Sequence, residues 1–303
     1  LEIGLQGKAL IIHRDGEYQR SIPLNLIERI VCNTSVITKT SVLASLAHNG
    51  VGINLFGGRK GRLAAQLAGA GTLDVERRIG QFRCFLDESA RTAWSVRLIA
   101  HKLLRQQRLL KQALRRRLDQ RLFLSKGIER IGDLRQRLSA EHIGNRETLR
   151  GIEGAAARHY FQSYAGILPP ALNFSGRNRR PPKDPVNVLL SLGYTLLHGE
   201  LMQIISSVGL DPWLGIYHDP AHSRASLVCD FQELYRHHID ELAWILTRER
   251  ILREHHFASE GDACLLTKEG RAIYYPIYET RMQKQRKLMR RILLGFAREW
   301  QRQ

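Results

Sequence analysis

The residue types that could do chemistry in this sequence begin with an acid among small residues and a histidine on a loop. Glu153 lies in the run 150–157, whose glycines and alanines let a ligand or another stretch of backbone approach closely. Because its neighbours are small or apolar, we expect Glu153 to face an interior or a cleft. His218 lies in a loop of turn residues, and His222, four residues further on, is the alternative. A loop histidine that only forms a hydrogen bond is the simpler explanation for either one.

Two further acids complete a set that could hold a divalent metal ion. Residues 225–236 are predicted to form a helix, in which Asp230 and Glu233 are three positions apart and share one face. The helix begins with apolar residues, so we expect Asp230 to be partly buried and to need a partner. Carboxylates with an imidazole suit a hard divalent cation, which proteins that cut or join phosphodiesters generally require. An exposed acidic pair without a ligand is the competing explanation.

The sequence carries a large excess of positive charge. Its 303 residues include 47 Lys and Arg against 29 Asp and Glu, a formal net charge of +18. Such a balance attracts polyanions, and the candidates are nucleic acid, an anionic membrane surface and an acidic protein. Ordinary apolar and charged fractions, 43% and 25%, exclude a disordered or collagen-like chain. Composition alone does not choose among the three partners.

A group of cations precedes the clearest helix signal in the sequence. Asp184 and Pro185 suit the N-cap and the first position of a helix, and the apolar stretch 186–197 follows. That stretch is too short to span a bilayer, so we predict a buried core helix. Cations beside the positive end of a helix are unfavourable unless an anion such as a phosphate binds there. The cations of this segment are Arg177, Arg179, Arg180 and Lys183.

Two longer segments combine an apolar stripe with many cations. In 97–121, apolar residues recur every four or seven positions beside nine Lys or Arg and one acid. Residues 280–303 repeat this arrangement with eight Lys or Arg and one acid, Glu299. We predict two amphipathic helices that dock through their stripes and leave cationic faces for DNA. A solvated helix face without a ligand is the alternative.

The pattern of the chain changes near residue 75. Before it, short β-rich runs alternate with turn signals: Asp15-Gly16 predicts a hairpin, 41–47 a short helix and 50–56 a strand. After it, the periodicity is helical. We therefore predict an α+β protein, in which residues 1–75 form a small N-terminal β-sandwich or β-roll domain and residues 76–303 form a larger all-helical catalytic and DNA-binding domain.

The cysteines and the start of the sequence indicate the compartment. The four cysteines are far apart and form no CxxC pair, which excludes a zinc ribbon and argues against disulfides. The first residues lack the basic and apolar pattern of a signal peptide. We therefore expect a cytoplasmic protein that does not enter a membrane. Because the sequence begins without Met, we also expect a segment cut from a longer polypeptide, or one that has lost a tag.

Four blocks in order along nearly the whole chain resemble the CRISPR adaptation integrases, metal-dependent DNA endonucleases that insert spacers into CRISPR arrays. Block 151–156 (GIEGAA) is similar to the segment with that family's first catalytic glutamate, and block 179–194 (RRPPKDPVNVLLSLGY) to its most recognisable stretch. Block 209–218 resembles the segment with the catalytic histidine, and block 226–236 the acidic segment that completes the metal site. Chance does not readily explain four blocks in the right order.

The resemblance implies how the site works. Glu153, His218 and either Asp230 or Glu233 would hold Mg²⁺ or Mn²⁺, and the last ligand stays open because family members differ at this point. A 3′-hydroxyl of the incoming DNA would attack a phosphodiester of the repeat, a transesterification that needs no external energy source. The side chains that would position the DNA backbone are Arg177, Arg179, Arg180 and Lys183.

The resemblance also implies partners. These are double-stranded DNA as spacer precursor and repeat, a second copy of the chain in a homodimer, a small ferredoxin-like CRISPR adaptation protein that bridges two dimers, and a fused or associated reverse transcriptase. Two other function classes stay open. A non-enzymatic DNA-binding scaffold needs the charge but no metal, and a structure-selective nuclease acting on branched DNA would cut strands without joining them.

Overall fold

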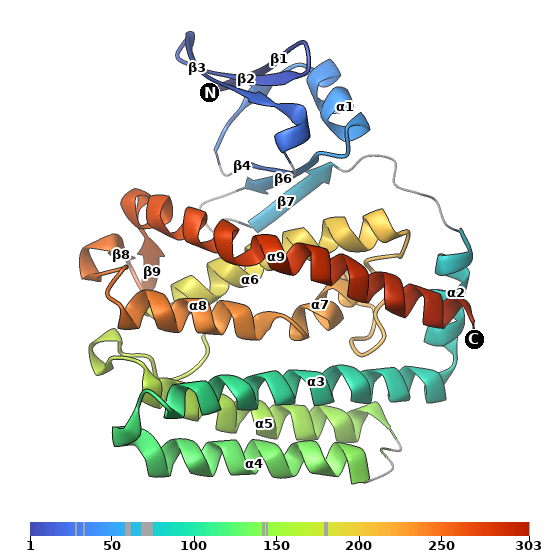
Figure 1. Ribbon diagram of the computed structural model, residues 1–303, viewed down its shortest axis with the longest axis vertical. Coiled ribbons are helices and arrows are strands. Elements are labelled where there is room, and N and C mark those ends of the chain that lie inside the picture. Colours follow the sequence, from blue (N-terminus) through green and yellow to red (C-terminus); the bar gives the residue numbers. More distant parts are fainter. Residues whose placement is uncertain are drawn as a thin grey trace.

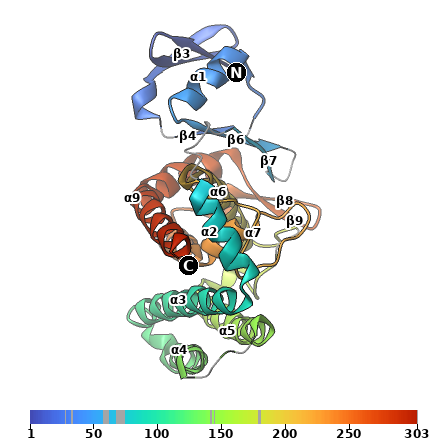
Figure 2. The same cartoon turned by 90° about the vertical axis from the view of Figure 1, so that its right-hand side faces the viewer.

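The computed structural model of the chain places a small β-rich domain above a larger helical domain (Figure 1). It describes residues 1–27, 29–32, 34–57, 62–67, 75–140, 143, 145–178 and 181–302. The view turned by 90° shows the same separation into two parts (Figure 2). The predicted α+β class is confirmed, with strands at the N-terminus and helices after them.

Two sheets and a short helix, α1 (Thr40–His48), enclose the core of the N-terminal domain. One sheet has the strand order β3-β2-β1-β5 and the other has the order β4-β6-β7. The predicted hairpin is present, because Asp15 and Gly16 take positive φ values between β2 and β3. The strands are β1 (Glu2–Gln6), β2 (Ala9–Arg14), β3 (Glu17–Pro23), β4 (Arg29–Cys32), β5 (Ile37–Thr38), β6 (Gly52–Gly57) and β7 (Arg62–Leu67).

The helical domain is stacked in layers beneath the sheets. α6 and α9 lie nearest the β-rich domain, and α3, α4 and α5 lie at the opposite end in both views (Figures 1 and 2). A hairpin of β8 (Phe257–Glu260) and β9 (Ala263–Leu266) adds to the predicted all-helical domain; its strands are too short to show an alternating pattern. The helices are α2 (Val75–Leu86), α3 (Glu88–Leu114), α4 (Arg121–Ala140), α5 (Arg146–Ile167), α6 (Pro185–Val208), α7 (Ser226–Glu233), α8 (Arg236–Arg248) and α9 (Lys268–Gln301).

The predicted core helix is α6, and its entry follows the capping prediction. Asp184 Oδ1 accepts a hydrogen bond from the backbone N–H of Asn187 at 2.9 Å, and Pro185 occupies the first turn. Gly209 ends the helix in the left-handed conformation with φ 87°. By length and composition α6 could cross a membrane, but 61% of its apolar stretch is buried inside the protein. It is therefore explained as a core helix.

The basic segment 97–121 is not one helix, contrary to the prediction. α3 ends at Leu114, and the chain turns before α4 begins. Arg117 closes this turn by donating to the carbonyl oxygen of Ile167 at 3.1 Å. The turn brings α4 back against α3 and α5, so Leu118 is 73% exposed instead of extending the apolar stripe.

Ion pairs of Arg29 join the domains. Arg29 of β4 lies 2.9 Å from Glu200 of α6 and also contacts Glu279 of α9. Arg286 donates to Glu200 as well, at 3.1 Å. Because the side chains of Arg29 and Glu200 are 7% and 1% exposed, the charges need each other, and the contact fixes how the β-rich domain sits on α6 and α9.

The contact between α2 and α9 yields a test of the packing. A Cβ atom at Gly80 would lie 2.6 Å from the carbonyl oxygen of Trp300, which is backbone and cannot rotate away. We expect Gly80→Ala to lower the free energy of unfolding by about 1 to 3 kcal/mol, the usual range for overpacking. Gly295→Ala on α9 is the control, since no heavy atom lies within 4 Å of its added Cβ. We expect that change to stabilise the helix by about 0.5 to 1 kcal/mol. Urea unfolding measures both, and an unaltered stability of Gly80→Ala would contradict the packing.

Candidate active site

One buried carboxylate holds the loop that carries His218. Asp230 of α7 is fully buried and accepts hydrogen bonds from the backbone N–H groups of Ile216 at 2.5 Å, Tyr217 at 3.0 Å and His218 at 2.9 Å. Its Oδ1 also lies 2.7 Å from Nδ1 of the His218 ring. The acceptor-only carboxylate requires the proton on Nδ1, so Nε2 is the nitrogen presented for a metal ion or a proton.

The same loop depends on a glycine. A Cβ at Gly215 would lie 2.4 Å from the carbonyl oxygen of His218 and 2.6 Å from the Cβ of Ser226, so only glycine fits where the loop folds back on α7. The rival histidine, His222, is exposed on the far part of the loop. The structure thus brings His218, and not His222, to the acidic helix.

Two acids from different helices converge on one ammonium group. Lys102 of α3 contacts Glu153 of α5, and its Nζ lies 2.7 Å from Oε2 of Glu233 on α7. Arg236 lies 3.2 Å from the other oxygen of Glu233. The side chains of Lys102 and Glu233 are 8% and 6% exposed, whereas Glu153 is 24% exposed. The site is therefore closed on the side of α3 and α7 and reaches solvent near Glu153.

The positive charges keep Glu233 ionised despite its burial. Burial by itself raises the pKa of this carboxyl group, but the charges of Arg236 and Lys102 together lower the pKa to about 2. His218 also contributes to the lowered pKa of Glu233. Glu233 is therefore an anion at neutral pH and can act as a ligand without losing a proton.

The donor set fits a divalent metal ion by its chemistry. Oε2 of Glu233 is buried and accepts no hydrogen bond in the described part of the chain, although it has the ion pair with Lys102. Two carboxylates and one imidazole are the kinds of ligand that Mg²⁺ and Mn²⁺ bind. As the side chains stand, the described residues contain no group of three His, Cys, Asp or Glu close enough to hold an ion. The Lys102 ammonium lies between Glu153 and Glu233, where an ion would have to replace it.

The four predicted site residues take different places. Glu153 and Glu233 meet at Lys102, and the His218 ring contacts Asp230, which lies one turn before Glu233 on α7. Asp230 is on the same helix as Glu233 but is directed at the loop, so the two acids do not face one common partner. Sequence reasoning missed Lys102, which it counted among the exposed cations of the segment 97–121. The one signal available was that Lys102 stands next to a residue of the apolar stripe.

Arg177 is engaged inside the protein. Its Nη1 donates to the side-chain oxygen of Asn187 at 2.6 Å, and its Nη2 donates to the hydroxyl of Ser191 at 3.0 Å. The amide oxygen of Asn187 on α6 thus occupies the place where an anion was predicted. A DNA contact of Arg177 stays a prediction. The other cations of this segment are Lys183, which is exposed, and Arg179 and Arg180, which lie outside the described residues.

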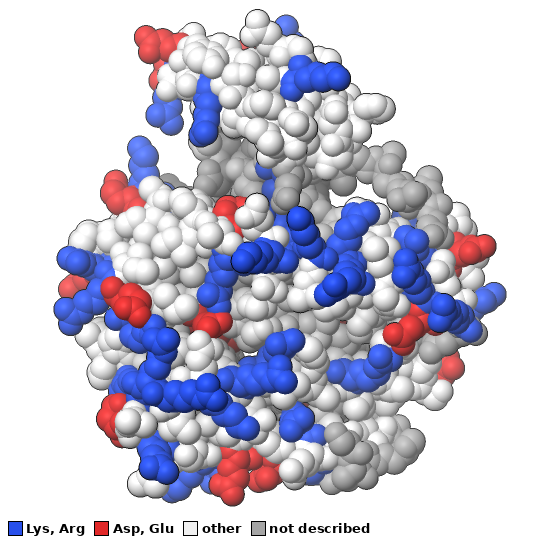
Figure 3. Space-filling view, in the orientation of Figure 1, with Lys and Arg blue, Asp and Glu red and all other residues white. Residues whose placement is uncertain are grey.

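Lys and Arg side chains gather on the face formed by α9 and α3 (Figure 3). The predicted stripe of the C-terminal segment is confirmed, because Met289, Leu293 and Trp300 are buried and dock α9 on the core. The exposed cations on these helices include Arg97, Arg108 and Lys111 of α3, and Lys284, Lys287, Arg290, Arg291 and Arg298 of α9. This surface suits a polyanion such as the DNA backbone.

The sequence is similar to CRISPR-associated proteins. The profile of the family described as "CRISPR associated protein Cas1" matches residues 1–280. The chain is 35% identical to "CRISPR-associated endonuclease Cas1 1" of Thermodesulfovibrio yellowstonii over 305 residues, which cover 98% of this chain and 93% of that protein.

Solved structures share the fold along the whole chain. A Cas1 protein from Thermotoga maritima superposes with a TM-score of 0.85 at 21% identity, covering 99% of this chain and 94% of that one. A casposase bound to its integration product gives 0.84 at 20% identity, with 99% and 88% covered. A chain of a Cas6-RT-Cas1–Cas2 complex gives 0.83 at 24% identity, with 99% of this chain and 34% of that chain covered. At these identities the likeness shows the fold.

The role of Asp230 in the loop can be measured by amide hydrogen exchange. In Asp230→Asn the charge is lost and one accepting oxygen becomes an NH₂ group. We expect the amide hydrogens of Ile216, Tyr217 and His218 to exchange at least about tenfold faster, since a hydrogen bond to a charged group contributes about 1.5 to 3 kcal/mol. Glu233→Gln, on the same helix, should leave these three amides unchanged. Equal exchange in the two variants would show that Asp230 does not hold the loop.

Lys102→Met tests the cation between the two acids and keeps the length of the side chain. Glu153 and Glu233 would then repel each other in a largely buried site. We expect the free energy of unfolding in a metal chelator to fall by about 3 kcal/mol, the lower end for breaking a buried pair, because Glu233 keeps Arg236. Added Mn²⁺ should reduce the loss. The control is Lys111→Met, exposed on the same helix, for which we expect a change below about 0.5 kcal/mol. The interpretation fails if both variants unfold like the unchanged protein.

Proposed function

The chain belongs to the Cas1 family of CRISPR-associated endonucleases, and from this premise we propose that Glu153, His218 and Glu233 form the centre at which it joins spacer DNA to a CRISPR array. The observation that supports this assignment most directly is the convergence of Glu153 and Glu233 on one cation, with His218 held by Asp230 one turn before Glu233. Like charges are brought together in a protein interior at a cost, and a scaffold that only binds DNA has no need of them.

The reaction is a phosphodiester exchange. The 3′-hydroxyl oxygen of the incoming strand forms a bond to the phosphorus of a repeat phosphodiester, and the bond from that phosphorus to the repeat's own 3′-oxygen breaks. The hydroxyl proton leaves the attacking oxygen, and the departing oxygen gains one. Because the number of phosphodiester bonds stays the same, the exchange needs no external energy source.

Glu153, His218 and Glu233 would hold the divalent ion, Mg²⁺ or Mn²⁺, through oxygen and imidazole ligands. When bound, this ion stabilises the charge that develops on the phosphoryl and leaving oxygens. Asp230 positions rather than binds, since its oxygens are occupied by the loop and by the His218 ring. Lys102 balances the two carboxylates, and its ammonium must move aside for the ion.

The DNA backbone would lie on cationic surfaces next to this centre. We assign the exposed faces of α3 and α9 to phosphate contacts, supported by the density of Lys and Arg on that side of the molecule (Figure 3). Contacts of this kind position the duplex and carry no sequence information. We also propose DNA contacts, as the resemblance implies, for the cations that precede α6 in the sequence: Arg177, Arg179, Arg180 and Lys183.

The assembly proposed around the chain follows its two-domain layout. We propose that residues 1–75 form the dimerisation domain, supported by the change from strands to helices between β7 and α2. We also propose that a small ferredoxin-like adaptation protein bridges two dimers. The chain and its partners are proposed to act in the cytoplasm. The fold shared with a chain of a Cas6-RT-Cas1–Cas2 complex supports a Cas2-like bridge and an associated reverse transcriptase.

Glu153→Ala tests the centre. We expect integration of a short duplex into a supercoiled array plasmid to be abolished in the presence of Mn²⁺ and the small partner protein. DNA affinity should stay unchanged or rise slightly, because a negative charge near the phosphates is removed. Gel analysis of joined products and a binding titration measure the two effects.

The matched control is Glu147→Ala, an exposed acid in the first turn of the same helix, which should integrate normally. Near-normal integration by Glu153→Ala would show that Glu153 is not a ligand. If the unchanged protein cuts branched DNA and joins no strands, the structure-selective nuclease is the better description.

A further inference from the structure

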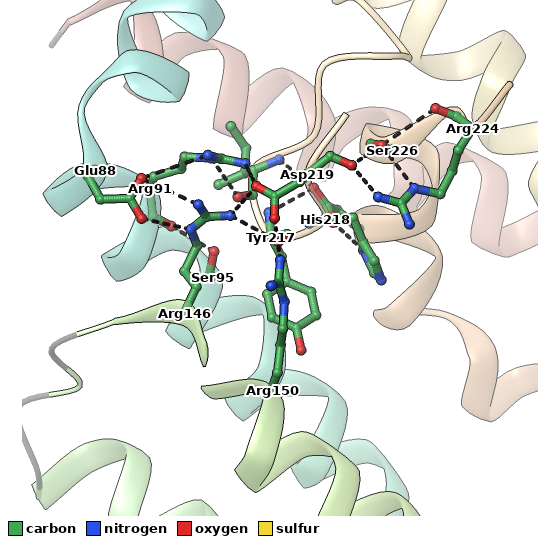
Figure 4. A network of polar contacts seen from close by, with 12 residues as sticks. Glu88, Arg91, Ser95, Arg146, Arg150, Tyr217, His218, Asp219, Arg224 and Ser226 are labelled. Atoms are coloured by element: carbon green, nitrogen blue, oxygen red, sulfur yellow. Dashed lines mark hydrogen bonds and ion pairs between the residues drawn. The ribbon is translucent and has the colours of Figure 1, made fainter. Parts of the chain in front are cut away.

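Three arginines converge on the carboxylate that directly follows His218 (Figure 4). Oδ1 of Asp219 accepts from Arg91 of α3 at 2.8 Å and from Arg146 of α5 at 2.7 Å. Oδ2 of Asp219 accepts from Arg150, also of α5. The guanidinium groups hold the pKa of Asp219 well below its usual range, in spite of its partial burial. Asp219 is thus a fixed anion that ties the His218 loop to two helices.

Two of these arginines serve the structure. Arg91 is nearly buried and also donates to the carbonyl oxygen of Ile216 at 3.0 Å. The side chain of Arg146 is 14% exposed and donates to Glu88 at 2.9 Å as well. Both guanidinium groups are therefore shared among several acceptors and have little surface left for a ligand.

Arg150 differs from its two neighbours. Its side chain is 48% exposed, and Asp219 is its one polar partner among the described residues. It precedes Glu153 by three positions on α5, so the two side chains share a helix face.

The local charge also calls for an anion. Three guanidinium groups pair with the two carboxylates of Asp219 and Glu88, so within these ion pairs the cations outnumber the acids by one. The N–H donors of an arginine form a planar fork. When one donor holds the side chain in place, the others are free to bind a phosphate oxygen.

We propose that Arg150 binds a non-bridging phosphate oxygen of the DNA strand beside the reacting phosphodiester, and that Asp219 is the positioning residue that aims it. This inference rests on the proposed function, since it names a contact of the same site. The competing explanation is that Arg150 has a structural role only and fastens the loop to α5.

The first measurement is DNA binding with a metal chelator present, so that no chemistry contributes. The probe is a short duplex of the repeat, and its affinity is measured from low to high salt. For Arg150→Gln we expect about a tenfold weaker affinity at low salt and a salt slope reduced by about 0.9, the value for one duplex phosphate contact. Arg150→Lys should keep most of the slope. Arg130→Gln, an exposed arginine on the outer helix α4, removes the same charge and should bind like the unchanged protein.

The second measurement locates the contact. Single phosphates of the repeat around the integration point are replaced, one at a time, by uncharged methylphosphonates. At one position next to the reacting phosphate, the replacement should weaken binding of the unchanged protein and have no further effect on Arg150→Gln. Thermal unfolding confirms that each variant is folded.

The outcomes separate this inference from the function on which it rests. If Arg150→Gln binds with unchanged affinity and slope while the unchanged protein integrates DNA, Arg150 has a structural role only and the inference fails alone. It fails in the same way if every methylphosphonate has the same effect on both proteins. If the coupling appears but the unchanged protein joins no strands, the phosphate contact stands and the proposed integration fails.

Discussion

A buried carboxylate is tolerated only where hydrogen bonds replace the water it has lost, and Asp230 meets this condition with four donors. Three are consecutive backbone N–H groups, at 216–218, and the fourth is the ring of His218. The loop makes all four hydrogen bonds in one conformation, and this conformation sets the direction of the imidazole. Because Glu233 follows Asp230 by one turn of α7, the same contact also places the acid that faces Lys102. The chemistry of the site depends on this one carboxylate being held.

A substantial part of the positive charge acts inside the protein. Arg29, Arg91 and Lys102 are nearly buried, and each contacts two acids from other parts of the chain or from its own helix. The charge of Lys102 helps to lower the pKa of the buried Glu233, and the hydrogen bond from Arg91 helps to lower that of Asp219. The pairs also tie together helices that are distant in sequence. The cations that remain exposed give the surface its attraction for a polyanion, so the total charge overstates the surface available to DNA.

Signals that act over a few residues predicted their elements: the Asp-Gly hairpin, the cap of α6 and the stripe of α9 are all present. Contacts between distant segments could not be predicted in this way. Lys102 resembles the other cations of 97–121 in sequence, and only the packing of α5 and α7 against α3 shows that it joins the buried Leu103 in facing the core. Likewise, a spacing of three residues placed Asp230 and Glu233 on one helix face. It could not show that the N–H groups of the loop donate to Asp230. The blocks that resemble the integrases named the candidate site residues, whereas the roles proposed for these residues rest on tertiary contacts.

The C-terminal half of α6 carries the contact between the domains and leads into the loop with His218. Glu200 in its second half pairs with Arg29 of the β-rich domain, and Gly209, just past its last turn, begins the loop that carries His218. The domain contact lies on the side of α6 and α9, whereas the acids meet between α3, α5 and α7 (Figure 1). The contact between the domains and the candidate site therefore lie on different sides of the helical domain. Because close-packed interiors transmit strain, we expect a substitution at Glu200 to be felt at Gly209, where the loop that Asp230 holds begins.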